Sequence, residues 1–190
     1  PAMLQAIDEA ARSVTLSTYI FAHDGAGKRF LESLQRAVSR GVEVRVLIDD
    51  VGARYSWRPM PRVLRRAGIP CAQFLPTLIP WRFQYSNLRC HRKILVVDGR
   101  IGFTGGINID ERNCLAQQPR HAVQDLHFRV TGPVVAQFQE TLADDWAFYG
   151  SARVATFWEN QDVDNNPTAE DEDLLWFIQG NSRIGAKVNG

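Results

Sequence analysis

The sequence predicts an α/β domain over residues 1–150, built on a mixed, mostly parallel sheet flanked by helices. One observation is the alternation of β-branched, strand-like runs with segments whose apolar residues recur at helical spacing. Another is the length of 190 residues, 45% of them hydrophobic, which suits one globular domain with a short appendage. No run of about 18 apolar residues occurs, so we expect no membrane-spanning segment.

In the first half of the domain, the sequence predicts three strands, each preceded by a helix. Apolar residues at helical spacing predict helices over residues 4–11, 30–38 and 59–67. β-Branched and aromatic runs predict strands over residues 13–21, 42–48 and 69–74. Glycines separate these elements, because Gly25 breaks the first strand while Gly41 and Gly68 end the later two helices.

The second half predicts a hairpin, one more strand and a long helix. Segments 91–97 and 101–104 flank Asp98-Gly99-Arg100, a turn signal, so we expect them to pair as a hairpin. A strand is expected over 124–130. Pro133 then opens a helix, whose apolar stripe consists of Val134, Phe138, Leu142, Trp146 and Tyr149.

The composition changes after this helix. Residues 151–173 are predicted to be a linker, because 159–173 are acidic and polar and almost free of large apolar side chains. Residues 174–190 are predicted to be either the start of a further unit or a disordered tail.

Charge and cysteine content exclude some classes of protein. With 22 basic and 21 acidic side chains, the net charge of +1 excludes a strongly basic nucleic-acid coat, although it leaves room for a local phosphate site. The three cysteines are odd in number and widely spaced, so we expect no disulfide framework and a reducing compartment. The N-terminal residues lack the charged and apolar regions of a signal peptide.

The chemistry is concentrated in residues 91–108. On a strand His91 and Lys93 would share one face, and an imidazole beside an ammonium group is an unusual choice for a core face. Together they suit an anion, with Lys93 supplying charge and His91 acting as nucleophile or acid/base. The backbone at Gly106 could approach a ligand closely, and Asn108 could donate an amide hydrogen to a phosphate oxygen.

This pattern resembles the signature of the phospholipase D superfamily: His, any residue, Lys, four residues, Asp, six residues, Gly-Gly, any residue, Asn. The matching positions are His91, Lys93, Asp98, Gly105, Gly106 and Asn108. The flanking stretches 17–21, 40–47, 87–93 and 124–130 are similar to the bacterial cardiolipin synthase branch. The resemblance covers about residues 3–150 and implies a phospholipase D-like half-domain.

The resemblance also implies roles for individual residues. His91 would attack phosphorus and form a phosphohistidine intermediate. Lys93, Asn108 and the backbone of Gly106 would bind the phosphate oxygens. Asp125 would hydrogen-bond His91 and fix its tautomer, whereas Asp98 would orient the framework of the site. No metal or cofactor is implied.

The sequence contains only one such motif. Family members build one active site from two motifs, in which one histidine attacks and the other protonates the leaving group. The site would therefore be completed by a second copy in a homodimer, or by a second motif-bearing half. The family-like stretch that begins at residue 171 favours the second half.

The activity implied by the resemblance is that of a cardiolipin synthase-type phosphatidyltransferase, with phosphatidylglycerol as substrate. The alternatives are a phospholipase D hydrolase or a homodimeric phosphodiesterase acting on nucleic acid, and an inactive half-domain that binds lipid or a partner. We expect a peripheral protein on the cytoplasmic side of the bacterial inner membrane, or a cytoplasmic one. The aromatic and basic segment 75–85 could contact a membrane or pack on the domain.

Other patterns are weaker. Asp49 and Asp50 end a predicted strand, where α/β proteins often bind ligands, but a helix N-cap or a solvated turn is the simpler interpretation. The spacing of cysteines and histidines fits none of the usual zinc patterns.

Overall fold

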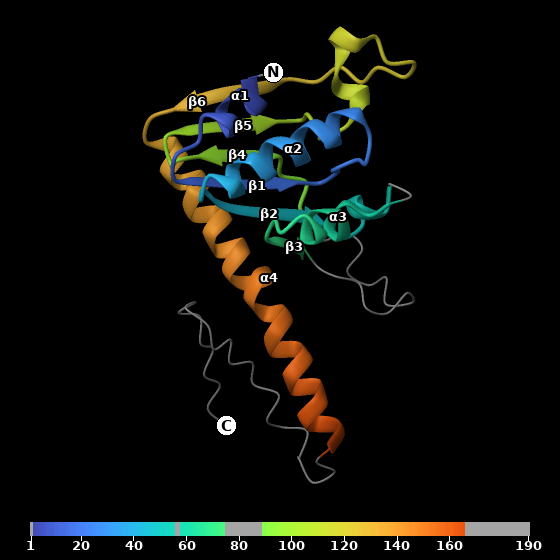
Figure 1. The fold of residues 1–190 in the computed structure, drawn as a ribbon, viewed down its shortest axis with the longest axis vertical. Coiled ribbons are helices and arrows are strands. Elements are labelled where there is room, and N and C mark those ends of the chain that lie inside the picture. Colours follow the sequence, from blue (N-terminus) through green and yellow to red (C-terminus); the bar gives the residue numbers. More distant parts are fainter. Residues whose placement is uncertain (1, 56–57, 75–88, 166–190) are drawn as a thin grey trace. The chain divides into compact units, whose positions relative to one another are not determined.

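The structure is a computed structural model that describes residues 2–55, 58–74 and 89–165 (Figure 1). Six strands form one mixed sheet in the order β3-β2-β1-β4-β5-β6. Their bounds are β1 (Ser13–Thr18), β2 (Glu43–Asp49), β3 (Cys71–Phe74), β4 (Ile94–Val97), β5 (Ile101–Gly105) and β6 (His127–Thr131). The predicted α/β class with a mixed sheet is confirmed.

Parallel pairing is confined to one half of the sheet. β1 and β2 pair in parallel, as do β2 and β3, in agreement with the predicted alternation of helix and strand. The remaining pairs, β1–β4, β4–β5 and β5–β6, are antiparallel. The expected predominance of parallel pairing is therefore wrong for the second half. A tight turn joins β4 directly to β5, which requires antiparallel pairing, whereas parallel neighbours need a crossover connection.

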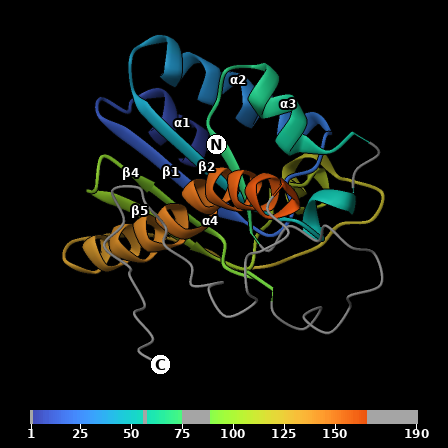
Figure 2. The ribbon, with the colours of Figure 1, turned by 90° about the horizontal axis from the view of Figure 1, so that it is seen from below.

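Helices cover both faces of the sheet (Figure 2). α1 (Ala2–Asp8), α2 (Gly25–Ser39) and α3 (Met60–Arg66) pack on one face, where Ile7, Leu34 and Leu64 join a single buried cluster. The start of α4 (Val134–Asn165) covers the other face, through Val135 and Leu142. Side chains of β4 alternate between the two clusters, as the period of two in a strand requires. Short 3-10 helices lie at Gly52–Tyr55 (η1), Glu111–Asn113 and Leu115–Gln117.

The chain divides into two compact units, residues 1–142 and 143–190. α4 continues as far as Asn165, through the beginning of the segment predicted to be a linker. Within the part of the chain that the structure describes, no helix is both long and apolar enough to cross a bilayer. The predicted segments 75–85 and 174–190, and residues 166–173 of the predicted linker 151–173, lie outside the described residues.

Three element boundaries differ from the predictions near the motif. β4 begins at Ile94, so His91 and Lys93 precede the strand, and β6 begins at His127, after Asp125. β1 ends at Thr18, beyond which the chain turns toward the Asn108 segment: Ile109 donates a backbone hydrogen bond to Ile20 and accepts one from Ala22. For β1, tertiary hydrogen bonds therefore end the strand before its β-prone sequence does.

Candidate active site

Cys90 anchors the segment that carries His91. Its side chain is only 4% exposed, and its Sγ lies 3.7 Å from Oγ of Ser17, a buried residue on β1. The next residue, His91, is exposed. This anchor fixes the chain immediately before His91 and leaves the imidazole at the surface.

The His91 ring stacks on Tyr19. The two ring centroids lie 4.3 Å apart, with 22° between the ring planes. Among the described residues, none forms a hydrogen bond with a ring nitrogen of His91. Burial raises the pKa of Tyr19, and the neighbouring Tyr55 and Asp49 add to this effect, so Tyr19 stays neutral beneath the imidazole at neutral pH. The geometry supports the ring and leaves its nitrogens accessible.

Lys93 places its ammonium group beside this stack. Its Nζ donates to the backbone carbonyl of His91 at 2.8 Å and lies 5.6 Å from the ring centroid of Tyr19. No carboxylate in the described ranges forms an ion pair with it. Burial lowers the pKa of Lys93, although the Asp125 carboxylate opposes that shift. A partly desolvated ammonium group without an ion-pair partner is suited to a phosphate oxygen.

Asn108 is anchored to the segment that follows β1. Its Oδ1 accepts a hydrogen bond from the backbone N–H of Ile20 at 3.2 Å, which fixes the orientation of the amide. Nδ2 donates to no residue that the structure describes. Because Ile20 follows Tyr19 directly, this bond ties Asn108 to the support of the His91 ring.

Asp125 lies against Gly106. A Cβ atom at Gly106 would overlap the Asp125 carboxylate, so the glycine is needed for the close approach. Asp125 is exposed, and its Oδ1 accepts from the N–H of Leu126 at 2.7 Å. The described contacts include no hydrogen bond between Asp125 and His91. The proposed tautomer-fixing role of Asp125 therefore stays a prediction, whereas its electrostatic influence on Lys93 is present.

Asp98 lies at the opposite end of β4 from His91. Its carboxylate accepts from three successive backbone N–H groups, those of Ala11 at 3.0 Å, Arg12 at 2.7 Å and Ser13 at 2.9 Å. Burial acts to raise the pKa of Asp98, but these donors outweigh it and the net pKa is lowered. Asp98 holds the start of β1 to the β4–β5 turn, which is a framework role.

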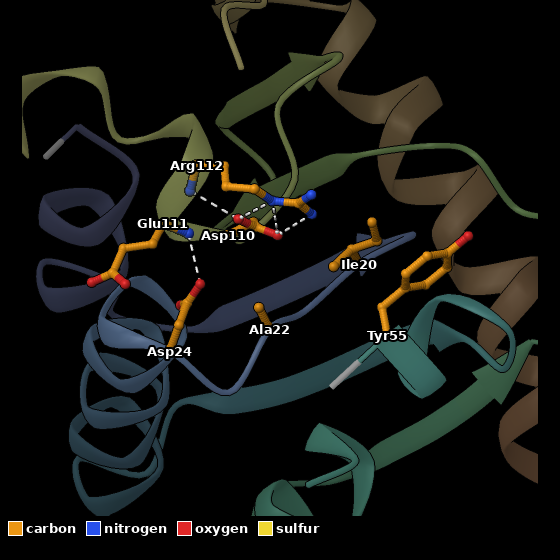
Figure 3. Close-up of a pocket in the computed structure, with 7 residues that line it drawn as sticks. All are labelled: Ile20, Ala22, Asp24, Tyr55, Asp110, Glu111 and Arg112. Atoms are coloured by element: carbon orange, nitrogen blue, oxygen red, sulfur yellow. Dashed lines mark hydrogen bonds and ion pairs between the residues drawn. The ribbon is translucent and has the colours of Figure 1, made fainter. Parts of the chain in front are cut away.

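A cavity of about 370 Å³ adjoins the site (Figure 3). Ile20 and Tyr55 form one wall, and Ala22, Asp24, Asp110, Glu111 and Arg112 complete the lining. The polar groups of that lining bind one another: Arg112 pairs with Asp110 at 2.6 Å, and Asp24 accepts from the N–H of Glu111 at 2.7 Å. These mutual contacts stiffen the loop after Asn108.

Metal ligands do not gather in the described part of the chain. No group of three or more His, Cys, Asp and Glu side chains there could hold a metal ion. Cys71, Cys90 and Cys114 are free thiols.

Sequence reasoning missed Tyr19 as a member of the site. It lies about seventy residues from the motif, in a stretch that reads as the end of a strand. The antiparallel pairing of β1 with β4 brings the two segments together. A tyrosine that follows a strand in the resembling stretch 17–21 was the available signal.

Fold and site together define a phospholipase D-like domain with one motif. The family model described as "Cardiolipin synthase, PLD-like domain" matches residues 3–146, and the chain belongs to this family.

Curated relatives include a cardiolipin synthase of Oceanobacillus iheyensis, 35% identical over 76% of this chain and 30% of that protein. Cardiolipin synthase A of Pseudomonas putida is 40% identical over 73% of this chain and 29% of its own length. Cardiolipin synthase 1 of Bacillus anthracis is 31% identical over 83% of this chain and 31% of its own length. The chain thus spans about three-tenths of the length of the relatives it matches.

Solved structures share the fold. A phospholipase D family member, Nuc from Salmonella typhimurium, superposes with a TM-score of 0.56 at 22% identity, covering 76% of this chain and 84% of that one. Phosphatidylserine synthase of Haemophilus influenzae Rd KW20 gives a TM-score of 0.55 at 16% identity, covering 76% of this chain and 33% of that one.

Proposed function

We propose that this chain supplies one motif of a cardiolipin synthase-type phosphatidyltransferase. The enzyme would move a phosphatidyl group from one phosphatidylglycerol to a hydroxyl of another and release glycerol. One observation carries the proposal: an accessible imidazole, His91, lies beside an ammonium group, Lys93, that has no described ion-pair partner. The similarity to cardiolipin synthases supports the choice of lipid as substrate.

In the first step, a ring nitrogen of His91 attacks the phosphorus of phosphatidylglycerol. The new N–P bond forms as the P–O bond to the glycerol headgroup breaks, and the leaving alkoxide takes a proton from the histidine of a second motif. Lys93 and the Nδ2 hydrogens of Asn108 bind the non-bridging oxygens, on which negative charge grows in the transition state.

In the second step, a hydroxyl of another phosphatidylglycerol transfers its proton to the second histidine and attacks the same phosphorus. The N–P bond breaks, His91 is regenerated, and cardiolipin leaves. If water took the place of the alcohol, the product would be phosphatidic acid, so the exclusion of water decides between transfer and hydrolysis.

The sequence contains a single motif, so in this proposal the second motif comes from a partner half. β6 is an edge strand of the described sheet. Phe128 on β6 is 57% exposed, and Leu126 just before the strand is 68% exposed. Asp125 precedes them directly. This strand edge pairs with no other strand in the described part of the chain. Together with the exposed apolar side chains next to the candidate site, it supports the docking of a second motif-bearing half there.

We also propose that the enzyme works at a membrane surface, on the cytoplasmic side of the bacterial inner membrane. A substrate with two acyl chains must be met at a bilayer. The cationic Lys93 beside an accessible imidazole suits the anionic headgroups of such a surface.

Product analysis tests the proposal. The protein, with its second motif-bearing half, is incubated with labelled phosphatidylglycerol vesicles, and cardiolipin, phosphatidic acid and glycerol are separated. We expect cardiolipin and glycerol in equal amounts, and their loss in a His91→Asn variant. His121→Ala is the matched control, because that histidine is exposed and lies outside the site. Phosphatidic acid alone would indicate a hydrolase, and full activity of His91→Asn would refute the proposal.

A further inference from the structure

Asp49 is a buried carboxylate that the proposed mechanism does not use. It is the last residue of β2 and is 1% exposed. A buried carboxylate needs hydrogen-bond donors, and Asp49 has three, all of them backbone N–H groups. Where those donors lie shows what the side chain holds together.

One carboxylate oxygen holds the segment that carries His91. Oδ2 accepts from the N–H of Cys90 at 3.0 Å. The side chain of Cys90 is already anchored on β1 beside Ser17. The residue before His91 is thus fixed by its side chain to β1 and by its backbone to β2.

The other oxygen holds the turn that supports Tyr19. Oδ1 accepts from the N–H of Val51 at 2.9 Å and from that of Gly52 at 3.2 Å. Gly52 packs directly against the backbone carbonyl of Tyr19, where a Cβ atom would overlap the carbonyl oxygen. Since the Tyr19 ring stacks on the His91 imidazole, this turn fixes the position of the ring that supports His91.

We infer that Asp49 is a positioning residue, which aligns the His91 imidazole by holding both the chain before it and the turn beneath its supporting ring. The inference rests on the proposed nucleophilic role of His91. Asp49 touches no substrate, so it acts on the rate of the chemical step through geometry. A carboxylate is required because all three partners are donors, and each of its oxygens serves a different side of the arrangement.

Asp49→Asn separates this role from a purely structural one. An asparagine side chain has nearly the same shape and can still accept from Val51 and Gly52. Its NH₂ group would then face the N–H of Cys90, donor against donor, so only the link to the His91 segment is lost. Asp50→Asn is the matched control, because Asp50 is also buried but binds Arg54 and Gln73 instead.

Amide hydrogen exchange by NMR gives a readout that needs no activity. In the parent protein we expect the Cys90 amide to be protected, because it donates to a buried carboxylate. In Asp49→Asn that protection should fall by at least about tenfold, while the Gly52 amide stays protected. An unprotected Cys90 amide in the parent would overturn the inference without any variant having to fold.

Kinetics on phosphatidylglycerol vesicles, with the second motif-bearing half present, complete the test. A displaced nucleophile should lower kcat by about 100-fold and leave KM within about twofold. Asp50→Asn should keep the parent kcat at equal folded fraction. An Asp49→Asn variant that loses Cys90 protection but keeps its kcat would overturn the positioning role. Failure of the proposed function is distinguishable, because it would appear as an active His91→Asn variant.

Discussion

Replacing Asp98 with asparagine should weaken the fold without altering the chemistry. The carboxylate accepts three backbone N–H bonds from residues 11–13, with distances between 2.7 and 3.0 Å. Asparagine keeps one acceptor oxygen and tolerates the left-handed backbone of this position, where φ is 54°. A hydrogen bond to a charged group contributes roughly 1.5–3 kcal/mol, and less where water competes. Since these bonds are partly exposed, we expect a loss of about 2 kcal/mol.

The pH dependence of this loss gives a second check. The folded pKa of Asp98 is lowered below its ordinary value, so its contribution is fully present above the unfolded pKa of about 3.9. It disappears as the pH falls through the lower folded pKa. Urea unfolding followed by circular dichroism should therefore show a gap between parent and Asp98→Asn at pH 7 that shrinks below about pH 4.

Asp8→Asn is the control for Asp98. Asp8 pairs with Arg36 at the surface, where an ion pair contributes at most about 1 kcal/mol. Two results would show that the Asp98 carboxylate does not hold the start of β1 to the β4–β5 turn. One is equal stability of Asp98→Asn and the parent at pH 7. The other is a difference in the free energy of unfolding that persists unchanged at low pH.

Three further predictions concern other residues. Tyr19→Phe keeps the stacked ring and should keep kcat within about threefold, whereas Tyr19→Ala should lower kcat by about tenfold or more in the vesicle assay; equal rates would argue against the stacking. His127 is half-buried, and its Nδ1 has no hydrogen-bond partner among the residues that the structure describes. Burial lowers the folded pKa of His127, although Asp125 opposes that shift. Its unfolded form therefore binds more protons, stability falls as the pH drops below about 6.5, and His127→Phe should reduce that fall in urea titrations at pH 7 and 5.5. Leu34→Ala should cost about 2–5 kcal/mol in the same titrations, because Leu34 is fully buried; a loss under 1 kcal/mol would contradict the described core.

Local chemistry explains what the sequence could predict. The turn at Asp98-Gly99 depends on adjacent residues only, so the hairpin of β4 and β5 could be predicted from the sequence. The motif residues were found because their spacing is local. The helices α2 and α3 followed from apolar periodicity. The structure shows that α2 begins at Gly25, before the predicted start at residue 30, because the Asp24 side chain caps it there.

Non-local contacts explain what the sequence could not predict. The antiparallel pairing of β1 with β4 joins residues about eighty positions apart, and no local pattern specifies it. Asp49 was interpreted as a helix cap or a solvated turn. It does cap the turn into η1, but it is buried, because the Cys90 segment closes over it.

During turnover, His91 is expected to become covalently bound to phosphorus. The most direct measurement is mass spectrometry of peptides from protein mixed with phosphatidylglycerol and its partner half, then denatured at alkaline pH, where phosphohistidine survives. A phosphatidyl group is expected on the peptide that contains His91 in the parent protein, and none on that peptide in a His91→Asn preparation. A phosphatidyl group on another residue, or turnover by His91→Asn, would contradict this expectation.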